Sequence, residues 1–198
     1  FFKPMQKDLA IVIPCYNEAD RIPVSQFENF LSSQPTVSIF FINDGSKDKT
    51  YAILTTLKNQ FPSQIEVHCI KRNGGKANAV FTGFQQLLKY KNYRKVAYLD
   101  ADLATSLEEC LLLSEKVKEK VVLAFGSRIL KLDNQIKRKW YRFILGRLVA
   151  TAISNILGLS IYDSQCGCKI FEAKTAEKIF SEPFISKWLF DVEIFFRM

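Results

Sequence analysis

The stretch at residues 96–106 reads Val-Ala-Tyr-Leu-Asp-Ala-Asp-Leu-Ala-Thr-Ser and joins an apolar run to two carboxylates. Its first four residues have the length and composition of a buried strand. Ser106, followed three residues later by Glu109, forms a capping-box pattern that predicts a helix from residue 107. The stretch therefore predicts a strand, a polar exit and a helix in succession.

The same unit recurs along the chain. Apolar runs of strand length precede and follow it at residues 9–14, 37–42, 65–70 and 121–126. Segments of helical length lie between the strands, at residues 24–32, 50–60, 76–90 and 107–119. Because parallel neighbours need a crossover connection, this alternation predicts an α/β fold with a mostly parallel central sheet and helices on both faces. The nearly continuous apolar character of the strands fits burial on both sides.

Length and composition set the remaining bounds. With 198 residues, 48% of them hydrophobic, the chain is long enough for one domain over residues 1–198. Its net charge of +8 favours an anionic partner, such as a phosphorylated ligand, a nucleic acid or an anionic membrane. The five cysteines are odd in number and lie mostly in apolar runs, which favours reduced thiols over a disulfide framework or a zinc site.

A polar segment follows each predicted strand. In parallel sheets the ligand crevice lies beyond the carboxyl ends of the strands, so these exits are expected to meet. A single polar segment after a strand is equally well explained as an ordinary turn. Five such segments together favour a ligand-binding site. Gly74 and Gly75 precede a predicted helix, as in loops that bind anions at a helix start, although no Walker motif is present. The side chains expected to converge are those of Asn17, Glu18, Asp44, Lys76, Asp100, Asp102 and Arg128.

Asp100 and Asp102 carry the clearest chemical signal. Residues two apart on an extended chain point the same way, and the capping box leaves neither aspartate needed as a helix cap. Two like charges repel unless a cation or protons lie between them. Hard divalent ions are typically held by one or two carboxylates together with substrate phosphates. The pair therefore predicts a Mg²⁺ or Mn²⁺ site beside a diphosphate.

A basic run and an apolar window adjoin at residues 137–161. The run at residues 137–142 offers Arg138 and Arg142 on one helical face, where they can position an anionic acceptor. A solvated basic face is the alternative. Arg147 and Asn155 interrupt the window that follows, which favours an amphipathic interfacial helix over a membrane-spanning one. We expect attachment to the cytoplasmic face of a membrane, either peripheral or with anchoring segments outside these 198 residues.

Seven motifs in order carry a resemblance to a known family. They read VIPCYNEADRI at 12–22, FFINDGSKDKT at 40–50, NGGKANAVFTGF at 73–84, YLDADLATS at 98–106, GSRI at 126–129, DSQCGCKIF at 163–171 and WLFDVEIFF at 188–196. With these motifs the chain resembles the inverting family 2 glycosyltransferases. Within that family it is similar to the polyprenyl-phosphate hexosyltransferases of the dolichyl-phosphate type.

The resemblance implies a Rossmann-like fold of the GT-A type that binds a nucleotide-sugar donor and a polyprenyl-phosphate acceptor. The motifs at 163–169 and 188–193 look like those of enzymes that transfer glucose from UDP-glucose. Ala104 stands where some relatives carry a polar metal ligand, a place that Thr105 or water could fill. The implied residues are Pro14, Tyr16, Asn17, Glu18 and Asp44 at the base and ribose, Gly75 and Lys76 at the nucleotide, Asp100 and Asp102 at the metal and diphosphate, and Arg128 at the acceptor.

Four further polar residues lie in the last two motifs: Asp163, Gln165, Asp191 and Glu193. As substrate-site residues, the three carboxylates can serve as a base, as a lid anchor or as sugar ligands; the alternative is that they are plain caps. A phosphate acceptor needs no base, because its second pKa is about 6 and it is already an anion at neutral pH. A saccharide-hydroxyl acceptor needs one, which leaves Asp163 or Asp191 as candidates under that alternative.

A nucleic-acid-binding module is the alternative from another class. The sequence favours it least, because the positive charge clusters after Ser127 and no such binding motif is present. We therefore expect no nucleic-acid partner. The oligomeric state and the length of the polyprenol stay open at the level of sequence.

Overall fold

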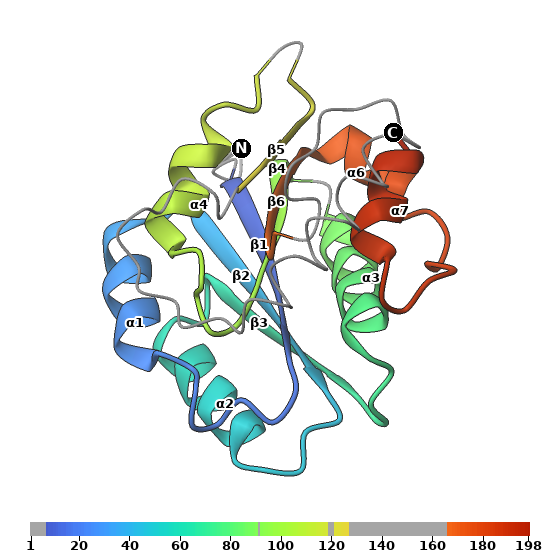
Figure 1. Cartoon of the computed structure of the whole chain (residues 1–198). Helices are drawn as coiled ribbons and strands as arrows, with labels where there is room; N and C mark the ends of the chain where they lie inside the picture. Colours follow the sequence, from blue (N-terminus) through green and yellow to red (C-terminus); the bar gives the residue numbers. More distant parts are fainter. Residues whose placement is uncertain (1–6, 91, 119–120, 127–165) are drawn as a thin grey trace, which may run out of the picture.

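The computed structural model describes residues 7–90, 92–118, 121–126 and 166–198 and contains one six-stranded sheet (Figure 1). Its order is β3-β2-β1-β4-β6-β5. The strands are β1 (Lys7–Cys15), β2 (Val37–Asp44), β3 (Ile65–Ile70), β4 (Tyr93–Leu99), β5 (Leu123–Phe125) and β6 (Cys168–Glu172). All five strands expected from the sequence are present, and β6 is an additional one.

The sheet is mostly parallel, as predicted. Val12 of β1 pairs with Phe40 of β2 on one side and with Tyr98 of β4 on the other, both in parallel register. β6 lies antiparallel to both β4 and β5, so β5 runs in the same direction as β4. Antiparallel β6 therefore begins at the edge where the parallel strands end, and it brings the residues before Cys168 beside the exit of β4.

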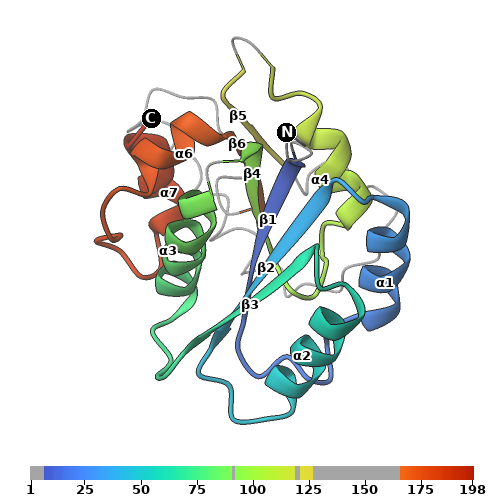
Figure 2. The same cartoon turned by 180° about the vertical axis from the view of Figure 1, so that it is seen from behind.

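Helices cover both faces of the sheet, which confirms the predicted layers (Figures 1 and 2). One face carries α1 (Val24–Ser33), α2 (Thr50–Gln60) and α4 (Leu107–Ser114). The other carries α3 (Lys76–Leu87), α6 (Ala173–Ile179) and α7 (Phe190–Phe196), with the short 3₁₀ turn η1 (Leu88–Tyr90) after α3. Ile11 and Ile13 of β1 contribute to the first core and Val12 to the second, so an unbroken apolar strand is needed.

Two predicted helices are shorter than expected. The helix expected over 76–90 ends at Leu87 and continues as the 3₁₀ turn, and the helix expected over 107–119 ends at Ser114. The start of α4 agrees with the sequence, because Ser106 and Glu109 form the reciprocal capping box. No helix within the described part of the chain is both long and apolar enough to cross a bilayer.

Gly83 brings α3 close to the sheet. A Cβ at this position would overlap the side chains of Val12 and Ile42, so only glycine permits this contact. The stacked rings of Phe84 and Phe180, with centroids 3.7 Å apart, join α3 to the end of α6. This packing fixes the start of α3, and with it Lys76, above the carboxyl edge of the parallel strands.

Candidate functional site

The exits of β1 and β2 are bonded to each other. The Asn17 side chain accepts a hydrogen bond from the Lys47 amide at 2.8 Å, and the Asn17 amide donates to Ser46 Oγ at 3.0 Å. The Glu18 amide donates to Thr50 Oγ1 at 2.8 Å. Asn17 adopts a positive φ of 52°, a conformation that asparagine tolerates better than most residues. Tyr16, beside this bonded pair of loops, is exposed, while Pro14 lies within β1.

Asp44 organises the exit of β3. Its carboxylate is buried and accepts hydrogen bonds from the amides of Gly74 and Gly75, each at 2.9 Å. The two amides that the sequence offers for anion binding are therefore engaged by a carboxylate of the chain itself. Gly75 has a φ of 87°, which favours glycine at the residue before α3. Asp44 thus holds the loop that carries Lys76.

Asp100 and Asp102 lie directly after β4, with Ala101 between them buried in the first core. Each carboxylate is about one third exposed, at 32% and 35%, and each forms an ion pair with a cation from another exit. Lys76 Nζ lies 2.6 Å from Asp100 Oδ1, and Arg21 Nη2 lies 2.6 Å from Asp102 Oδ2. The backbone here is not the extended chain that the prediction assumed, because it turns at Ala101 and Asp102, where the Leu103 amide donates to the Asp100 carbonyl at 3.1 Å. Both carboxylates nevertheless lie where the exits of β1, β3 and β4 meet.

Arg21 is a site residue that the sequence reasoning missed. Besides Asp102, its guanidinium contacts Glu18, with Nη1 3.2 Å from Oε2. Burial raises the pKa of Glu18, Arg21 opposes this shift, and the negative charges of Asp102, Asp100 and Asp48 add to it. Its place in the NEADR run after the first strand was the available signal, but its partner lies 81 residues away in the sequence.

The crowding of carboxylates bears on a metal ion. Carboxylate oxygens are the donors that hard divalent cations prefer. Within the described ranges, however, no three aspartate, glutamate, histidine or cysteine side chains lie close enough together to hold a metal ion. The donor set therefore fits a cation held by Asp100 and Asp102 with the remaining positions supplied by phosphate oxygens of a ligand. Such a cation would take the place of Lys76 and Arg21 as the partner of the two carboxylates.

Gly167 supports Asp100 from the entry to β6. The Asp100 amide donates to the Gly167 carbonyl at 3.0 Å. A Cβ on residue 167 would overlap the Asp100 carboxylate, so the carboxylate occupies the space that any larger residue would need. The glycine between Cys166 and Cys168 in the sequence thus has a direct consequence for the position of Asp100.

A buried ion pair lies behind this glycine. Lys169 Nζ lies 2.5 Å from Asp191 Oδ1, and it also donates to Tyr98 Oη at 2.8 Å and to the Cys166 carbonyl at 3.0 Å. The Tyr98 hydroxyl donates to Asp191. Burial raises the pKa of Tyr98 well above its ordinary value, and the charge of Asp191 adds to the shift. Burial lowers the pKa of Lys169, which Asp191 opposes.

The network joins three elements, because Tyr98 lies in β4, Lys169 in β6 and Asp191 in α7. The Tyr98 ring lies between this network and the site, because Lys76 Nζ is 5.8 Å from the centroid of the ring. Asp191 is thus enclosed beneath the site with its carboxylate already paired.

Glu193 anchors the loop before α7. Its carboxylate accepts hydrogen bonds from the amides of Ile185 and Ser186 and forms a 2.6 Å ion pair with Arg197. Burial acts to raise the pKa of Glu193, but these amides and the guanidinium together hold the pKa below its ordinary value. Of the readings that the sequence left open for Glu193, this geometry matches a loop anchor.

Several predicted residues fall outside the described residues. These are Arg128, Arg138, Arg142, Asp163 and Gln165, together with the segment at 137–161. Among the described residues, Asn17, Glu18, Asp44, Gly75, Lys76, Asp100 and Asp102 lie at the joined exits, whereas Asp191 and Glu193 lie beneath and beside them.

Curated glycosyltransferases match this chain along almost its whole length. The chain is 32% identical over 203 residues to the dolichyl-phosphate beta-glucosyltransferase of Dictyostelium discoideum, covering 95% of this chain and 61% of that protein. It is 28% identical to the polyprenol monophosphomannose synthase of Mycolicibacterium smegmatis, covering 98% of this chain and 73% of that protein. The chain thus spans about three fifths of the length of the first of these relatives.

Solved structures share the fold. Glucosyl-3-phosphoglycerate synthase from Mycobacterium tuberculosis, in complex with Mn²⁺, uridine diphosphate and phosphoglyceric acid, superposes with a TM-score of 0.60 at 15% identity. The match covers 87% of this chain and 58% of that one, and it supports a GT-A glycosyltransferase fold. Residues 10–180 match the sequence profile of glycosyl transferase family 2. The chain therefore belongs to glycosyl transferase family 2.

Proposed function

We propose that this chain is a single catalytic domain that transfers glucose from UDP-glucose to a polyprenyl phosphate, with inversion at the anomeric carbon. The names of the relatives support the reaction, since one is a dolichyl-phosphate beta-glucosyltransferase and the other a polyprenol monophosphomannose synthase. The observation that carries the proposal is the convergence of Lys76, Arg21, Asp100 and Asp102 at the ends of the parallel strands.

The site residues divide the work on the donor. Asp100 and Asp102 would hold a divalent cation, Mg²⁺ or Mn²⁺, which when bound neutralises charge on the departing diphosphate. Lys76 and Arg21 lie within 2.6 Å of these carboxylates and are placed to contact diphosphate oxygens once the carboxylates have another partner. The bonded loops around Asn17 and Asp44 would receive the nucleoside, with the exposed Tyr16 beside the base.

The state of the other carboxylates favours a phosphate acceptor. An acceptor hydroxyl would need a general base, whereas a phosphate is already an anion at neutral pH. Asp191 is paired with Lys169 in the interior, and Glu193 is occupied by two amides and Arg197. Neither is open to accept a proton from an acceptor. Arg128, Arg138 and Arg142 are proposed to hold the acceptor phosphate, with the segment at 137–161 on the cytoplasmic surface of a membrane.

A transferase that acts on a saccharide hydroxyl is the second candidate. Asp163 is proposed as its base, a choice that the interior ion pair of Asp191 with Lys169 supports. The two candidates predict opposite variant profiles. Arg128→Ala and Arg142→Ala should each lower transfer to a polyprenyl phosphate about tenfold to a hundredfold, because a charge-assisted contact contributes roughly 1.5 to 3 kcal/mol. Asp163→Asn should abolish transfer only in the second candidate.

A donor screen tests the proposal at the level of binding. UDP-glucose, UDP-N-acetylglucosamine and GDP-mannose are compared by thermal shift, each with and without Mn²⁺. UDP-glucose should raise the melting temperature most, and only when Mn²⁺ is present. A larger shift with GDP-mannose would contradict the assigned donor, and an equal shift with EDTA would contradict the role of the cation.

A further inference from the structure

The loop between α6 and α7 exposes large apolar side chains. Ile185 is 94% exposed, Trp188 is 87% exposed and Leu189 is 46% exposed. Phe184, next to Ile185, points the other way and packs between the rings of Phe180 and Phe190, with centroids 5.5 Å and 5.4 Å away. The loop thus separates one apolar side chain that belongs to the core from three that face solvent.

Hydrogen bonds hold the loop in this form. Glu193 accepts the amides of Ile185 and Ser186, and the Leu189 amide donates to Ser186 Oγ at 2.9 Å. Arg197 donates to the carbonyls of Glu182 and Pro183 at 2.6 Å and 2.7 Å. These bonds fix the backbone of the loop on both sides of Lys187, so its exposed side chains are carried on an ordered segment. Exposed apolar groups on a fixed loop mark an interaction surface more strongly than exposed groups scattered singly do.

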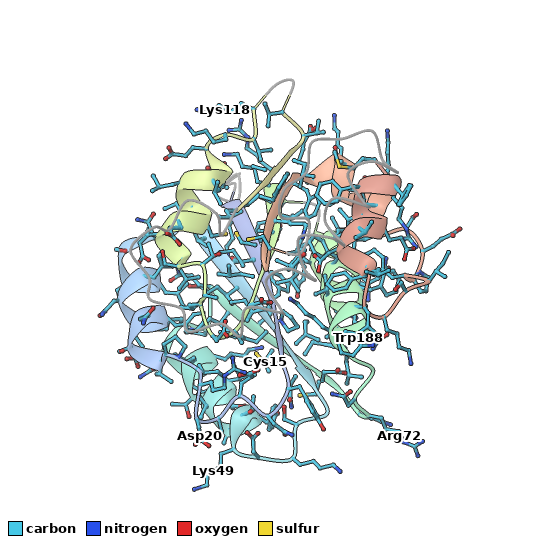
Figure 3. The ribbon with its side chains drawn as sticks, viewed as in Figure 1. Cys15, Asp20, Lys49, Arg72, Lys118 and Trp188 are labelled. Carbon is cyan, nitrogen blue, oxygen red and sulfur yellow. The ribbon has the colours of Figure 1, made fainter. Side chains whose placement is uncertain are left out.

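The loop lies beside the candidate site. Phe190, the first residue of α7, has its ring centroid 6.0 Å from Lys76 Nζ, and Lys76 is the partner of Asp100. Figure 3 places Trp188 in the half of the molecule that holds Cys15, the last residue of β1, and away from Lys118 at the other end. A surface that contacts this loop would therefore lie near the carboxylates.

We infer that Ile185, Lys187 and Trp188 enter the interface of an anionic phospholipid bilayer. Tryptophan is favoured at the boundary of headgroups and acyl chains, and a neighbouring lysine gains about 1 kcal/mol near an anionic surface. Glu182 lies in the same loop, so the attraction to anionic headgroups within it comes from Lys187 alone. A second copy fits less well, since two chains that each carry a net charge of +8 repel one another.

This inference rests on the proposed function, because a polyprenyl-phosphate acceptor lies in a membrane and the loop would hold the site against it. It adds a second point of attachment to the segment at 137–161. The two contributions are separable, because the residues of this loop can be changed without touching that segment.

Vesicle binding of the whole chain tests the inference. Ile185→Ser/Trp188→Ser is compared with Leu112→Ser/Val121→Ser, which removes exposed apolar side chains from α4 and from the start of the β5 region. Flotation uses phosphatidylcholine vesicles that contain phosphatidylserine, without donor or acceptor. The loop variant should partition onto vesicles about tenfold less than the unchanged protein, and the control should stay within about twofold. Equal losses in both variants, or no binding by the unchanged protein, would overturn the inference.

Fluorescence of Trp188 identifies what covers the loop. In a Trp140→Phe background Trp188 is the one remaining tryptophan. Its emission should be that of an exposed indole in solution and should shift to the blue when vesicles are added. Blue emission before vesicles are added would assign the loop to another part of the chain. A concentration-dependent dimer that the loop variant abolishes would assign it to a second copy. Either result overturns the bilayer assignment.

Transfer to a short, water-soluble polyprenyl phosphate separates this inference from the proposed function. The loop variant should transfer glucose to that acceptor as fast as the unchanged protein does. If soluble transfer proceeds and vesicle binding ignores the loop, the inference alone fails. If the unchanged protein makes no glucosyl lipid while its vesicle binding still depends on the loop, the proposed function alone fails.

Discussion

The carboxylate of Asp100 occupies the space that a Cβ on Gly167 would need, and the Asp100 amide donates to the Gly167 carbonyl at 3.0 Å. The entry to β6 therefore sets the position of a carboxylate at the exit of β4. Lys169 holds the same entry from below through the Cys166 carbonyl. The position of Asp100 thus depends on a contact that is 67 residues away along the chain.

Gly167→Ala is predicted to displace Asp100 and to lower turnover by about tenfold or more, because small misplacements of positioning groups are costly. The matched test is a double-mutant cycle with Asp100→Asn. If the alanine acts through Asp100, adding it to Asp100→Asn should cost little more. Equal losses in both backgrounds would show that Gly167 acts by another route.

Asp102→Asn and Arg21→Gln are predicted to change Mn²⁺ binding in opposite directions. Asp102→Asn removes a ligand charge and should weaken binding. Arg21→Gln removes the guanidinium that pairs with the Asp102 carboxylate at 2.6 Å. It should therefore strengthen Mn²⁺ binding several-fold when no donor is present. Titration of free Mn²⁺ by electron paramagnetic resonance measures both effects. Arg72→Gln, an exposed arginine after β3, is the control for overall charge, and a matching gain there would remove the specific role of Arg21.

Lys169→Met is predicted to lower the free energy of unfolding by about 3 to 5 kcal/mol, because it leaves the Asp191 carboxylate buried without its partner. Lys169→Met/Asp191→Leu should cost less than the sum of the two single changes. Urea unfolding measures each value. Lys58→Met breaks the exposed pair with Glu66 and should cost about 1 kcal/mol or less. A similar cost for Lys169→Met would mean that the interior pair is not structurally important.

Glu18→Gln is predicted to make stability depend less on pH. The pKa of Glu18 is raised in the folded protein, so the folded state binds this proton more readily than the unfolded state does. Stability from this group is present at low pH and is lost as the pH rises through the folded pKa. The glutamine variant should therefore melt at a higher temperature than the unchanged protein at neutral pH, and the gain should vanish below the ordinary pKa of glutamate, about 4.3. A gain that is constant across this range would rule out the titration of Glu18 as its cause.

The sequence was sufficient to predict most of the sheet, because strands such as β1 are buried on both faces and read as unbroken apolar runs. It was insufficient for β6, where Lys169 interrupts the apolar pattern. That lysine is buried only because Asp191 and Tyr98 lie opposite it, and no local pattern reports partners so distant. The sequence overestimated the length of two helices. Its helical pattern continues past Leu87 and Ser114, where the chain forms turns instead.

The candidate site, too, was predictable from the sequence only in part. The sequence predicted that Asp100 and Asp102 lie together after β4, and Ala101 between them is buried, but the extended backbone assumed for that prediction is wrong, because the chain turns from Asp100 to Leu103. The engagement of Asp44 by the amides of Gly74 and Gly75 did not follow, because a glycine-rich loop looks the same whether its anion is a ligand or a side chain. Arg21 was missed for a related reason, since its contact with Asp102 forms only when two loops meet.

Transfer of glucose from UDP-glucose to a short polyprenyl phosphate is the measurement that tests the central claim most directly. It is made with Mn²⁺ and with EDTA, for the unchanged protein and for Asp102→Asn, with a soluble saccharide as the competing acceptor. We predict a glucosyl phospholipid of inverted configuration that forms only with the cation, falls about a hundredfold or more in Asp102→Asn, and has no saccharide counterpart. Transfer to the saccharide in preference to the lipid phosphate, or full activity in EDTA, would contradict the claim.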